Sequence, residues 1–447
     1  MATSDIRSHR LEKAEIDRNF ADLHPPLGPS EALIEADRCY FCFDAPCTTA
    51  CPTGIDIPAF IQKIRSENRR GSARTILQEN IMGGMCARVC PTEVLCEEAC
   101  VRNTHEDKPV EIGLLQRYAT DPVFDESAKL FERAEPTGRK VAVVGGGPAG
   151  LSCAHRLASL GHDVVIYNRD DKLGGLNEYG IAAYKTVNDF AQREVDWILA
   201  IGGIEVKTGV VLGGDITLAD LQKSFDAVFL GIGLAGVNAL GLNDKKLDGV
   251  ENAVDYIAEL RQAKDTSTLP VGRNVVVIGG GMTAIDIAVQ SKRLGAENVD
   301  IVYRRGEKEM GASQFEQDLA RTNGVKIHHW AMPVRLHGED HVCAIELERT
   351  VLDAKGNLQM TGESATLDAD VVFKAIGQKL DDGTANSELG GVRIDGGKIV
   401  VDESQATSLD KIWAGGDCAT GGDDLTVTAV QQGKVAAMAI HGSLTNG

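Results

Sequence analysis

The pattern of apolar and polar positions predicts a helical start to the chain and, after it, two repeats of one strand–helix–strand unit. In GIDIPAFIQKIRSEN, Phe60, Ile61 and Ile64 recur at helical spacing, and Pro58 stands where a first helical turn tolerates it. Further on, VAVVGGGPAGLSCAHRLASLGHDVVIYNRD runs from an apolar strand through a glycine turn into a helix and a second strand. The stretch NVVVIGGGMTAIDIAVQSKRLGAENVDIVYRR repeats that order, so we expect a duplicated βαβ unit.

Cysteine placement separates the first part of the chain from the rest. Eight of the 11 cysteines precede residue 101. A polar linker, FERAEPTGRK, then leads into the first repeat, which predicts a distinct module of about 135 residues by the usual signs of a domain boundary. A chain of 447 residues is long enough for two or three such domains.

Charge and the first residues narrow the class of protein. A formal charge of −19 and a pI near 5.0 argue against nucleic acid or an anionic membrane as partner, because phosphate binding needs clustered Lys and Arg. The opening MATSDIRSHR lacks the apolar core of a signal peptide, and no run of eighteen apolar residues follows. We therefore expect a cytoplasmic protein, in which a cysteine framework binds metal more often than it forms disulfides.

Each repeat carries a glycine turn of the dinucleotide-binding type. The glycines permit a tight turn, a close approach of the backbone to a pyrophosphate, and packing of the helix on the strand. Each match follows an apolar strand and opens a helix, and this context predicts two bound nucleotides. The turn residues are Gly145, Gly147 and Gly150 in the first repeat and Gly279, Gly281 and Ala284 in the second.

The end of each second strand indicates which nucleotide is bound, because the residue facing the adenosine ribose lies about 20 positions after the turn. In the first repeat that residue is Asn168, where an acid is usual, although an amide oxygen can still accept a hydrogen bond. In the second repeat Arg304 and Arg305 stand there, and paired guanidiniums suit the 2′-phosphate of NADPH. The alternative is that both arginines are solvated surface charges.

The clustered cysteines have two candidate occupants. The spacings are C-x2-C-x4-C-x3-C-P from Cys39 and C-x3-C-P-x4-C-x3-C from Cys86. A C-P ending after C-x2-C is typical of ferredoxins, whereas C-x2-C alone also occurs in zinc sites. No redox-active C-x-x-C follows residue 100, and the isolated Cys153, Cys343 and Cys418 are expected to be buried and structural. If the two bound nucleotides are redox cofactors, their electrons need an outlet that zinc cannot supply, and this favours iron–sulfur clusters.

Four short motifs resemble the two-dinucleotide flavoprotein reductases: GGGPAG, LGG at 173–175, AIG at 375–377 and AGGD at 414–417. The resemblance implies an α/β fold in which a nicotinamide domain is inserted into an FAD domain, behind an α-helical iron–sulfur domain. Asp417 would accept hydrogen bonds from the ribityl chain, and Gly175 would let the backbone approach the flavin. The expected divisions are 1–137 (clusters), 138–270 and 375–447 (FAD), and 271–374 (NAD(P)).

The amino-terminal module resembles that of dihydropyrimidine dehydrogenase, in particular the separate reductase subunit of the bacterial two-subunit form. CYFCFDAPCTTACPTGIDIPAFI, GGMCARVCPTEVLCEEAC and VEIGLLQRYATD carry this resemblance. It implies two 4Fe–4S clusters and makes Cys86 a bystander. The implied ligands are Cys39, Cys42, Cys47 and Cys100 for one cluster, and Cys51, Cys90, Cys96 and the amide oxygen of Gln116 for the other.

The resemblance implies that NAD(P)H reduces FAD, and that electrons pass through both clusters to an FMN-containing partner subunit that reduces uracil or thymine. No acid–base pair or nucleophile is predicted, because the cofactors carry the chemistry. The alternatives are a glutamate synthase small subunit and a non-catalytic sensor with relic motifs. The remaining expected cofactor contacts are Pro148, Ala149, Gly174, Leu176, Thr283, Gly377, Gly416 and Thr426.

Overall fold

The computed structural model describes residues 10–242, 247–380, 389 and 391–445. The chain forms two compact units, each assembled from separate stretches of sequence. We call the first the nucleotide unit (residues 1–23, 179–187 and 237–378) and the second the flavin–cluster unit (residues 24–178, 188–236 and 379–447). The amino-terminal module is therefore not one piece, because α1 (Lys13–Asn19) belongs to the nucleotide unit, where Ile16 is buried in the core.

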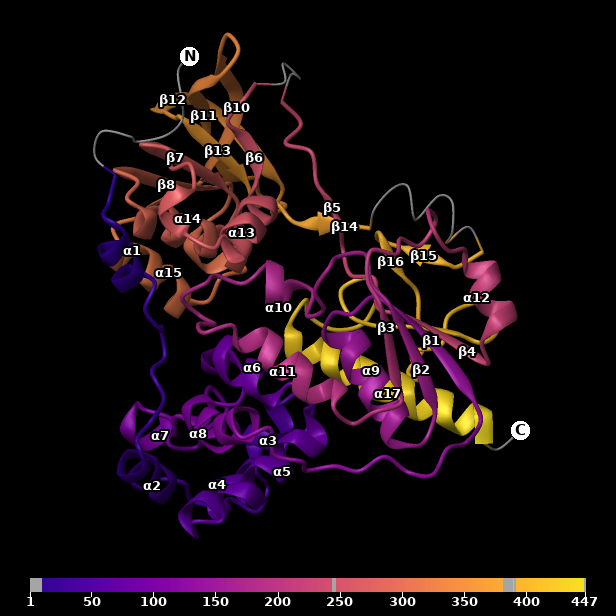
Figure 1. Ribbon diagram of the computed structural model, residues 1–447. Coiled ribbons are helices and arrows are strands. Elements are labelled where there is room, and N and C mark those ends of the chain that lie inside the picture. The colour runs from indigo at the N-terminus through magenta and orange to yellow at the C-terminus, as the bar shows by residue number, and fades with distance from the viewer. Residues whose placement is uncertain (1–9, 243–246, 381–388, 390, 446–447) are drawn as a thin grey trace. The chain divides into compact units, whose positions relative to one another are not determined.

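Helices alone make up the cysteine-rich part of the flavin–cluster unit (Figure 1). Their common core contains Ile57, Phe60, Ile61 and Ile64, and five of the cysteines pack against it. In α4, Asp56 caps the first turn by accepting a hydrogen bond from the Ala59 N–H, and the apolar residues then fall on one face, as predicted. The helices are α2 (Pro29–Asp37), α3 (Pro46–Ala50), α4 (Ile57–Arg65), α5 (Arg69–Glu79), α6 (Gly83–Val89), α7 (Asn103–Glu106) and α8 (Ile112–Asp125), with the 3-10 turn η2 (Thr92–Val94).

A parallel sheet in the order β17-β4-β1-β2-β3 completes the flavin–cluster unit. The first predicted βαβ repeat supplies its centre, while β17 comes from the last part of the chain and pairs with β4. The long α17 packs against α9 (Figure 1). The elements are β1 (Lys140–Val144), α9 (Pro148–Ser159), β2 (Asp163–Tyr167), α10 (Leu176–Tyr179), α11 (Phe190–Leu199), β3 (Ile204–Lys207), α12 (Leu218–Ser224), β4 (Ala227–Leu230), β15 (Ile394–Asp395), β16 (Lys398–Ile399), β17 (Ile412–Ala414) and α17 (Thr426–Thr445).

The nucleotide unit has a second parallel sheet, in the order β6-β13-β7-β8-β9. It also has an antiparallel sheet, β10-β11-β12, that the sequence analysis did not predict. The elements are β6 (Val250–Asn252), α13 (Ala253–Gln262), η3 (Thr266–Thr268), β7 (Asn274–Ile278), α14 (Met282–Leu294), β8 (Asn298–Tyr303), η4 (Glu307–Glu309), α15 (Gln314–Thr322), β9 (Lys326–His329), β10 (Ala331–Gly338), β11 (Val342–Leu352), β12 (Leu358–Asp368) and β13 (Val371–Lys374). The short strands β5 (Gly236–Val237) and β14 (Gln378–Lys379) pair where the chain passes between the units.

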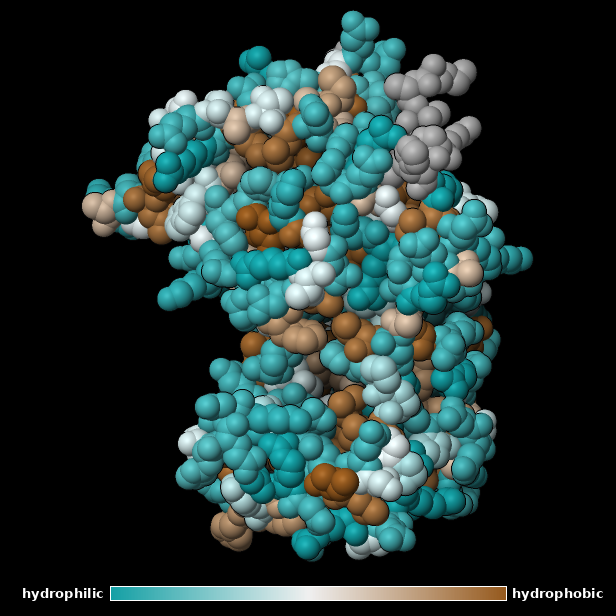
Figure 2. All heavy atoms as spheres, turned by 90° about the vertical axis from the view of Figure 1, so that its left-hand side faces the viewer, coloured by the Kyte–Doolittle hydropathy of each residue, from teal (hydrophilic) through white to brown (hydrophobic). Residues whose placement is uncertain are grey.

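The expected fold class is confirmed: an α-helical cluster domain precedes two Rossmann-like sheets, and the second sheet is inserted in the first. Hydrophilic residues predominate on the face in Figure 2, and apolar residues lie there in small separate patches. Within the described part of the chain, no helix combines the length and the apolar character that crossing a membrane requires.

Candidate cofactor sites

The first glycine turn joins β1 to α9 and leaves room for a phosphate. A side chain at Gly150 would lie 1.9 Å from the Gly145 carbonyl oxygen, so glycine is needed there for the helix to pack on the turn. At Gly147 the nearest atom to a built Cβ is the Cα of Gly175, 3.8 Å away. The turn therefore presents an open backbone at the amino end of α9, whose twelve residues supply the dipole that favours an anion.

Two segments that are distant in sequence converge on this turn. A Cβ on Gly175 would lie 2.9 Å from the Gly147 Cα, and one on Gly416 would lie 3.1 Å from the Ala149 Cβ. The predicted flavin residues of the 174–176 and 416–417 segments thus gather around the α9 amino end. Thr426, at the start of α17, donates from Oγ1 to Asn177 Oδ1 at 2.7 Å and ties α17 to α10.

Asp417 lies beside this turn with a carboxyl group largely withdrawn from water. Burial raises the pKa of Asp417 to about 6, and the negative charge of Asp424 adds to the effect. A hydroxyl donor would stabilise the carboxylate in such a place, because a hydrogen bond to the charged form offsets its lost hydration. Asp417 therefore has the properties expected of a residue that accepts hydrogen bonds from a ribityl chain.

Asn168 braces the first turn. Its Oδ1 accepts a hydrogen bond from the Gly146 N–H at 2.9 Å, while its Nδ2 donates to the carbonyls of Asp170 (2.7 Å) and Lys172 (3.1 Å). The side chain is only 8% exposed. These contacts explain why an amide replaces the usual acid: the position needs a donor as well as an acceptor. Its expected contact with a ribose stays a prediction.

The second glycine turn, between β7 and α14, repeats the open geometry. A side chain on Gly279, where φ is +148°, would lie 2.1 Å from the Ala375 carbonyl oxygen. Nothing lies within 4 Å of a Cβ built on Gly281, which caps the thirteen-residue α14. Thr283 and Ala284 follow in the first turn of α14. The sequence therefore supplies a second anion-binding helix end in the nucleotide unit.

Arg304 and Arg305 follow β8 in this unit, and both side chains are exposed. Their backbone carbonyls accept hydrogen bonds from Thr350 Oγ1 and the Trp330 N–H, which fixes the strand end. Among the described residues, neither guanidinium forms an ion pair. Gly377 lies elsewhere: its carbonyl accepts from the Asn238 N–H, in the segment that connects the two units.

The cysteines fall into two sets in the helical region. Cys39, Cys42, Cys47 and Cys100 line one cavity. Burial raises the pKa of Cys47 to about 11, and Cys39 and Cys100 lie near enough for their negative charges to raise it further. The structure thus brings together the four side chains that the resemblance assigned to one cluster, although Cys100 follows Cys47 by more than fifty residues.

The second set surrounds Cys90. A hydrogen bond with Cys86 raises the pKa of Cys90 most, followed by burial and by the charges of Cys96 and Cys51. Gln116, on α8, is 7% exposed, and its Nε2 donates to the Gly83 carbonyl on α6 at 2.6 Å. Since that bond engages the amide nitrogen, the amide oxygen is the atom left for a ligand role. Within the described ranges, no three or more His, Cys, Asp or Glu residues form a group suited to a single metal ion.

Backbone N–H groups point at two of the cysteine sulfurs. The Val110 N–H donates to Cys100 Sγ at 3.5 Å, and the Phe41 N–H donates to Cys39 Sγ at 3.4 Å. Hydrogen bonds to ligand sulfurs stabilise the more negative, reduced state of a cluster and so help to set its potential. These donors leave no signal in the sequence, because any residue except proline can supply a backbone N–H.

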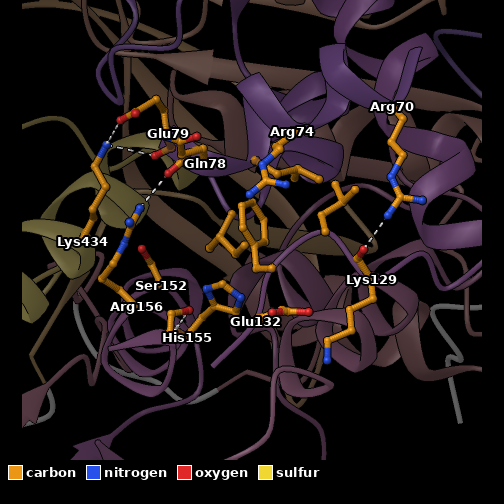
Figure 3. Close-up of a pocket in the computed structure, with 15 residues that line it drawn as sticks. Arg70, Arg74, Gln78, Glu79, Lys129, Glu132, Ser152, His155, Arg156 and Lys434 are labelled. Carbon is orange, nitrogen blue, oxygen red and sulfur yellow. Dashed lines mark hydrogen bonds and ion pairs between the residues drawn. The ribbon is translucent and has the colours of Figure 1, made fainter. Parts of the chain in front are cut away.

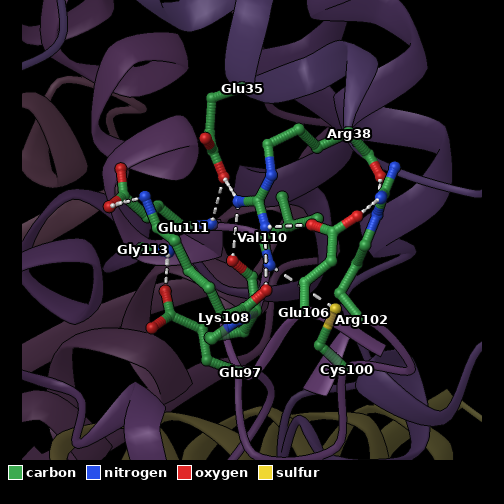
Figure 4. Close-up of polar contacts among 11 residues, drawn as sticks. Glu35, Arg38, Glu97, Cys100, Arg102, Glu106, Lys108, Val110, Glu111 and Gly113 are labelled. Atoms are coloured by element: carbon green, nitrogen blue, oxygen red, sulfur yellow. Dashed lines mark hydrogen bonds and ion pairs between the residues drawn. The ribbon is translucent and has the colours of Figure 1, made fainter. Parts of the chain in front are cut away.

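Arg38 holds the segment from which Val110 projects (Figure 4). Its Nη1 donates to the Pro109 carbonyl and its Nη2 to the Lys108 carbonyl, both at 2.8 Å. The guanidinium also pairs with Glu35 at 2.5 Å and with Glu106 at 3.1 Å. Five donors in a planar fork allow one arginine to hold both carbonyls and both carboxylates. Arg38 thereby fixes residues 106–110 next to Cys100.

Glu194, on α11, is fully buried against the amino end of α6. Its Oε1 accepts from the Gly84 N–H at 2.9 Å and the Met85 N–H at 3.1 Å. Burial raises the pKa of Glu194 to about 8, although those N–H groups and the Arg88 guanidinium oppose the shift. This carboxyl therefore connects α11, which belongs with the sheet β17-β4-β1-β2-β3 (the flavin sheet), to α6, the helix that precedes Cys90.

A buried ion cluster attaches residues 179–187 to the nucleotide unit. Lys185 Nζ lies 2.7 Å from Asp286 on α14 and 2.6 Å from Glu316 on α15. Burial alone would lower the pKa of Lys185, but the two carboxylates outweigh it and raise the pKa. Sequence reasoning missed this cluster, because its members come from three separate segments and none belongs to a motif.

The isolated cysteines differ from one another. Cys153 and Cys418 are buried, and the Cys418 thiol donates to the Gly415 carbonyl at 3.4 Å, in agreement with a structural role. The expectation for Cys343 was wrong, because this side chain is exposed. It lies on β11, where alternate side chains point to opposite faces of the sheet and the neighbour Val342 takes the buried face.

Two known protein families match the chain, one in the cysteine-rich part and one in the part that contains both glycine turns. Residues 139–433 match the family model described as pyridine nucleotide-disulphide oxidoreductase. Residues 16–128 match the model described as dihydropyrimidine dehydrogenase domain II, 4Fe-4S cluster. The second match favours iron and sulfide over zinc as the occupant of the cysteine-rich region.

Individual relatives match over nearly the whole chain. The NAD-dependent dihydropyrimidine dehydrogenase subunit PreT of Salmonella typhimurium is 35% identical over 428 residues, which cover 95% of this chain and 97% of that protein. The glutamate synthase (NADPH) small chain of Escherichia coli is also 35% identical, over 94% of this chain and 92% of its own length. Among solved structures, Mycobacterium tuberculosis FprA in complex with NADPH shares the fold, with a TM-score of 0.59 at 18% identity over 70% of this chain and 85% of that chain.

Proposed function

We propose that this chain, which belongs to the pyridine nucleotide-disulphide oxidoreductases, is the reductase subunit of a two-subunit dihydropyrimidine dehydrogenase. Its relatives are FAD and iron–sulfur enzymes, and they include dihydropyrimidine dehydrogenase reductase subunits and glutamate synthase small chains. In this proposal the chain takes hydride from NAD(P)H and delivers electrons to an FMN-containing partner, which reduces uracil or thymine to the 5,6-dihydropyrimidine. The observation that carries the proposal is the grouping of cysteines into two sets, in the same unit as a flavin-type glycine turn.

The residues of the flavin–cluster unit fit FAD. Bound FAD would accept one hydride, with its two electrons, and release these electrons singly, which is chemistry that no side chain offers. The chain's part is to bind and orient it: the α9 amino end suits a pyrophosphate, and Gly147 and Gly175 leave the backbone open there. Asp417 would hold the ribityl hydroxyls. No acid, base or nucleophile is assigned, because hydride transfer between stacked rings depends mainly on orientation.

The residues of the helical region fit two 4Fe–4S clusters. One set would supply Cys39, Cys42, Cys47 and Cys100. The other would supply Cys51, Cys90, Cys96 and Gln116, with the nearby Cys86 as the competing eighth ligand. The hydrogen bond from Gln116 to Gly83 supports the glutamine, since it orients the amide before a cluster is bound.

The coenzyme follows from the end of β8. Arg304 and Arg305 form no ion pair within the described part of the chain, and they stand where a 2′-phosphate would lie. This favours NADPH, whereas the printed name of the Salmonella relative specifies NAD. We propose that the chain accepts NADPH, and kinetics with both coenzymes would decide.

The second candidate is the small subunit of a glutamate synthase, which the equal identity to the Escherichia coli small chain supports. The two candidates share the cofactors and differ in the partner that accepts electrons. They are therefore separated by the partner, and nothing in the cofactor content of this chain would distinguish them.

The test begins with iron, sulfide and flavin analysis of anaerobically purified protein, followed by uracil-dependent NAD(P)H oxidation with and without a co-expressed FMN-containing subunit. The proposal predicts about eight irons and one FAD per chain, with uracil-dependent turnover only in the complex. Cofactors without a uracil response, but with activity in a glutamate synthase complex, would favour the second candidate. Zinc in place of iron would refute both.

A further inference from the structure

A basic cleft in the flavin–cluster unit is lined by charged side chains that take no part in the proposed electron path. Its volume is about 640 Å³, within the range of small-molecule sites. Its walls come from α5, from residues 129–132, from α9 and from α17. Five cationic side chains face two carboxylates there, in a chain whose formal charge is −19. The cationic side chains are Arg70, Arg74, Lys129, Arg156 and Lys434.

Within the described part of the chain, most of these cations have no carboxylate partner. Lys434 pairs with Glu79 at 3.0 Å, but Arg156 donates only to the neutral Gln78 carbonyl at 2.6 Å (Figure 3). Arg74 lies over the ring of Phe131, 5.9 Å from its centroid. In the ranges that the structure describes, no carboxylate lies within ion-pair distance of either arginine. The cleft therefore has an excess of positive charge.

The surroundings of Arg156 disfavour its positive charge. Partial burial lowers the pKa of Arg156, and only the more distant Glu79 opposes the shift. Beside it, burial lowers the pKa of His155 to about 3, so the imidazole stays neutral and relieves none of the charge at ordinary pH. A half-buried guanidinium bonded to one carbonyl is stabilised when an anion replaces its lost water.

We propose that the cleft binds a small organic anion that carries two or more phosphate or carboxylate groups. Arg74 and Arg156 project from α5 and α9, so one such ligand would connect the helical region to the flavin sheet. Guanidinium groups bind phosphate and carboxylate in the same bidentate way, and two of them favour a ligand with more than one charged group. The exposed Arg70 and Lys129 strengthen the attraction at longer range.

The test measures the Tm of the holoenzyme against rising concentrations of pyrophosphate and, separately, of citrate, at constant ionic strength. A ligand that binds only the folded state raises Tm in a saturable way. Arg74→Gln should weaken the apparent affinity about tenfold or more, because it removes a charged hydrogen-bonding group. The matched control is Arg335→Gln on the exposed face of β10, which should leave the affinity unchanged.

Each outcome is informative. A response to pyrophosphate alone or to citrate alone supports the proposal and identifies the charged group. No saturable shift with either probe at millimolar concentration overturns it. A shift that survives Arg74→Gln but disappears in Arg304→Gln also overturns it, because the anion would then occupy the nucleotide turn. Cofactor content and electron transfer are measured apart from this shift, so the two proposals fail separately.

Discussion

At the scale of single residues, the proposal of NADPH as coenzyme depends on Arg304. If Arg304 binds the 2′-phosphate as proposed, its replacement by alanine removes a charged hydrogen bond, which is worth about 1.5–3 kcal/mol. We expect the KM for NADPH to rise about tenfold or more and the KM for NADH to change little. Steady-state kinetics of Arg304→Ala with both coenzymes, beside Arg335→Ala as control, measures this. An unchanged KM for NADPH would show that Arg304 is a solvated surface charge.

Glu194 should make stability depend on pH. Its pKa of about 8 in the folded protein exceeds the ordinary value of 4.5, so the folded state holds the proton more tightly. The stability that this proton provides is fully present below about pH 4.5 and is lost as pH rises toward 8. Glu194→Gln keeps the acceptor for Gly84 and Met85 and does not ionise. We therefore expect wild type to lose stability relative to this variant between pH 6 and 8, by up to about 1.4 kcal/mol per pH unit.

Thermal unfolding across this pH range compares the two proteins. Glu205→Gln, on the exposed strand β3, is the matched control and should follow wild type at each pH. A constant difference between wild type and Glu194→Gln from pH 6 to 8 would show that Glu194 is already ionised at the lower pH.

Local patterns predicted the two glycine turns, because strand, turn and helix follow one another in the chain. The role of Arg304 at the end of β8 stays a prediction. Gln116 could be named only through the family resemblance, since LLQRYA reads as an ordinary helix surface. Its proposed role depends on α6, which supplies the Gly83 carbonyl from 33 residues away in the sequence. Arg38 and Glu194 were missed because each binds backbone groups of a distant segment, which leave no pattern in a sequence.

At the scale of elements, the segment 106–110 connects Arg38 to Cys100, which is a ligand of one of the two proposed clusters. Arg38→Met frees the Lys108 and Pro109 carbonyls and should loosen the Val110 N–H bond to Cys100. Since that bond stabilises the reduced state, we expect the midpoint potential of one cluster to become more negative while the other stays unchanged. Potentiometry followed by electron paramagnetic resonance measures both clusters. Arg273→Met, which breaks an exposed ion pair with Glu297 in the nucleotide unit, is the control, and equal spectra and potentials in all three proteins would refute the coupling.

The segment 179–187 depends on Lys185 for its attachment. Lys185→Met leaves Asp286 and Glu316 buried without a counter-ion, which costs about 3–5 kcal/mol when one partner of a buried pair is removed. Lys13→Met is a close match, because Lys13 also contacts two carboxylates, but on the surface. Denaturant unfolding should show a large loss for the first variant and little change for the second. Similar losses for both would mean that burial does not distinguish the two sites.

Among the elements, the two βαβ repeats were predictable because their strands are buried on both faces and read as continuous apolar runs. The sheet β10-β11-β12 was not, although IELE in β11 alternates apolar and charged residues as a half-buried strand does. This period-two alternation between the two repeats is the sequence signal for the sheet.

At the scale of the whole molecule, residues 10–23 belong with a unit that begins again far along the chain. Ile16 is 1% exposed in the core of the nucleotide unit. We expect Ile16→Ala to destabilise that unit by about 2–4 kcal/mol, with iron content unchanged. Ile61→Ala, an equal truncation in the core of the helical region, should instead lower the iron content. Iron analysis and nucleotide-protected unfolding of the two variants would separate these effects, and loss of iron in Ile16→Ala would contradict the division.

The division of the chain into these two units does not follow from the cysteine pattern. Cysteine placement suggested a module that ends near residue 135, but the contacts of α1 depend on α14, almost three hundred residues later. Composition changes mark where a chain changes character, and they do not show which distant segment a helix packs against.

The pairing of β17 with β4 has a consequence for the order in which the protein forms during synthesis. The flavin sheet lacks its edge strand until residues 412–414 have been made, and α9 lacks the helix that covers it until α17 follows. The parallel sheet of the nucleotide unit, in contrast, is complete at residue 374. Domains fold as their segments emerge. The nucleotide unit can therefore complete its folding first on the ribosome. The flavin–cluster unit completes its sheet later, and only then can that sheet bind a cofactor.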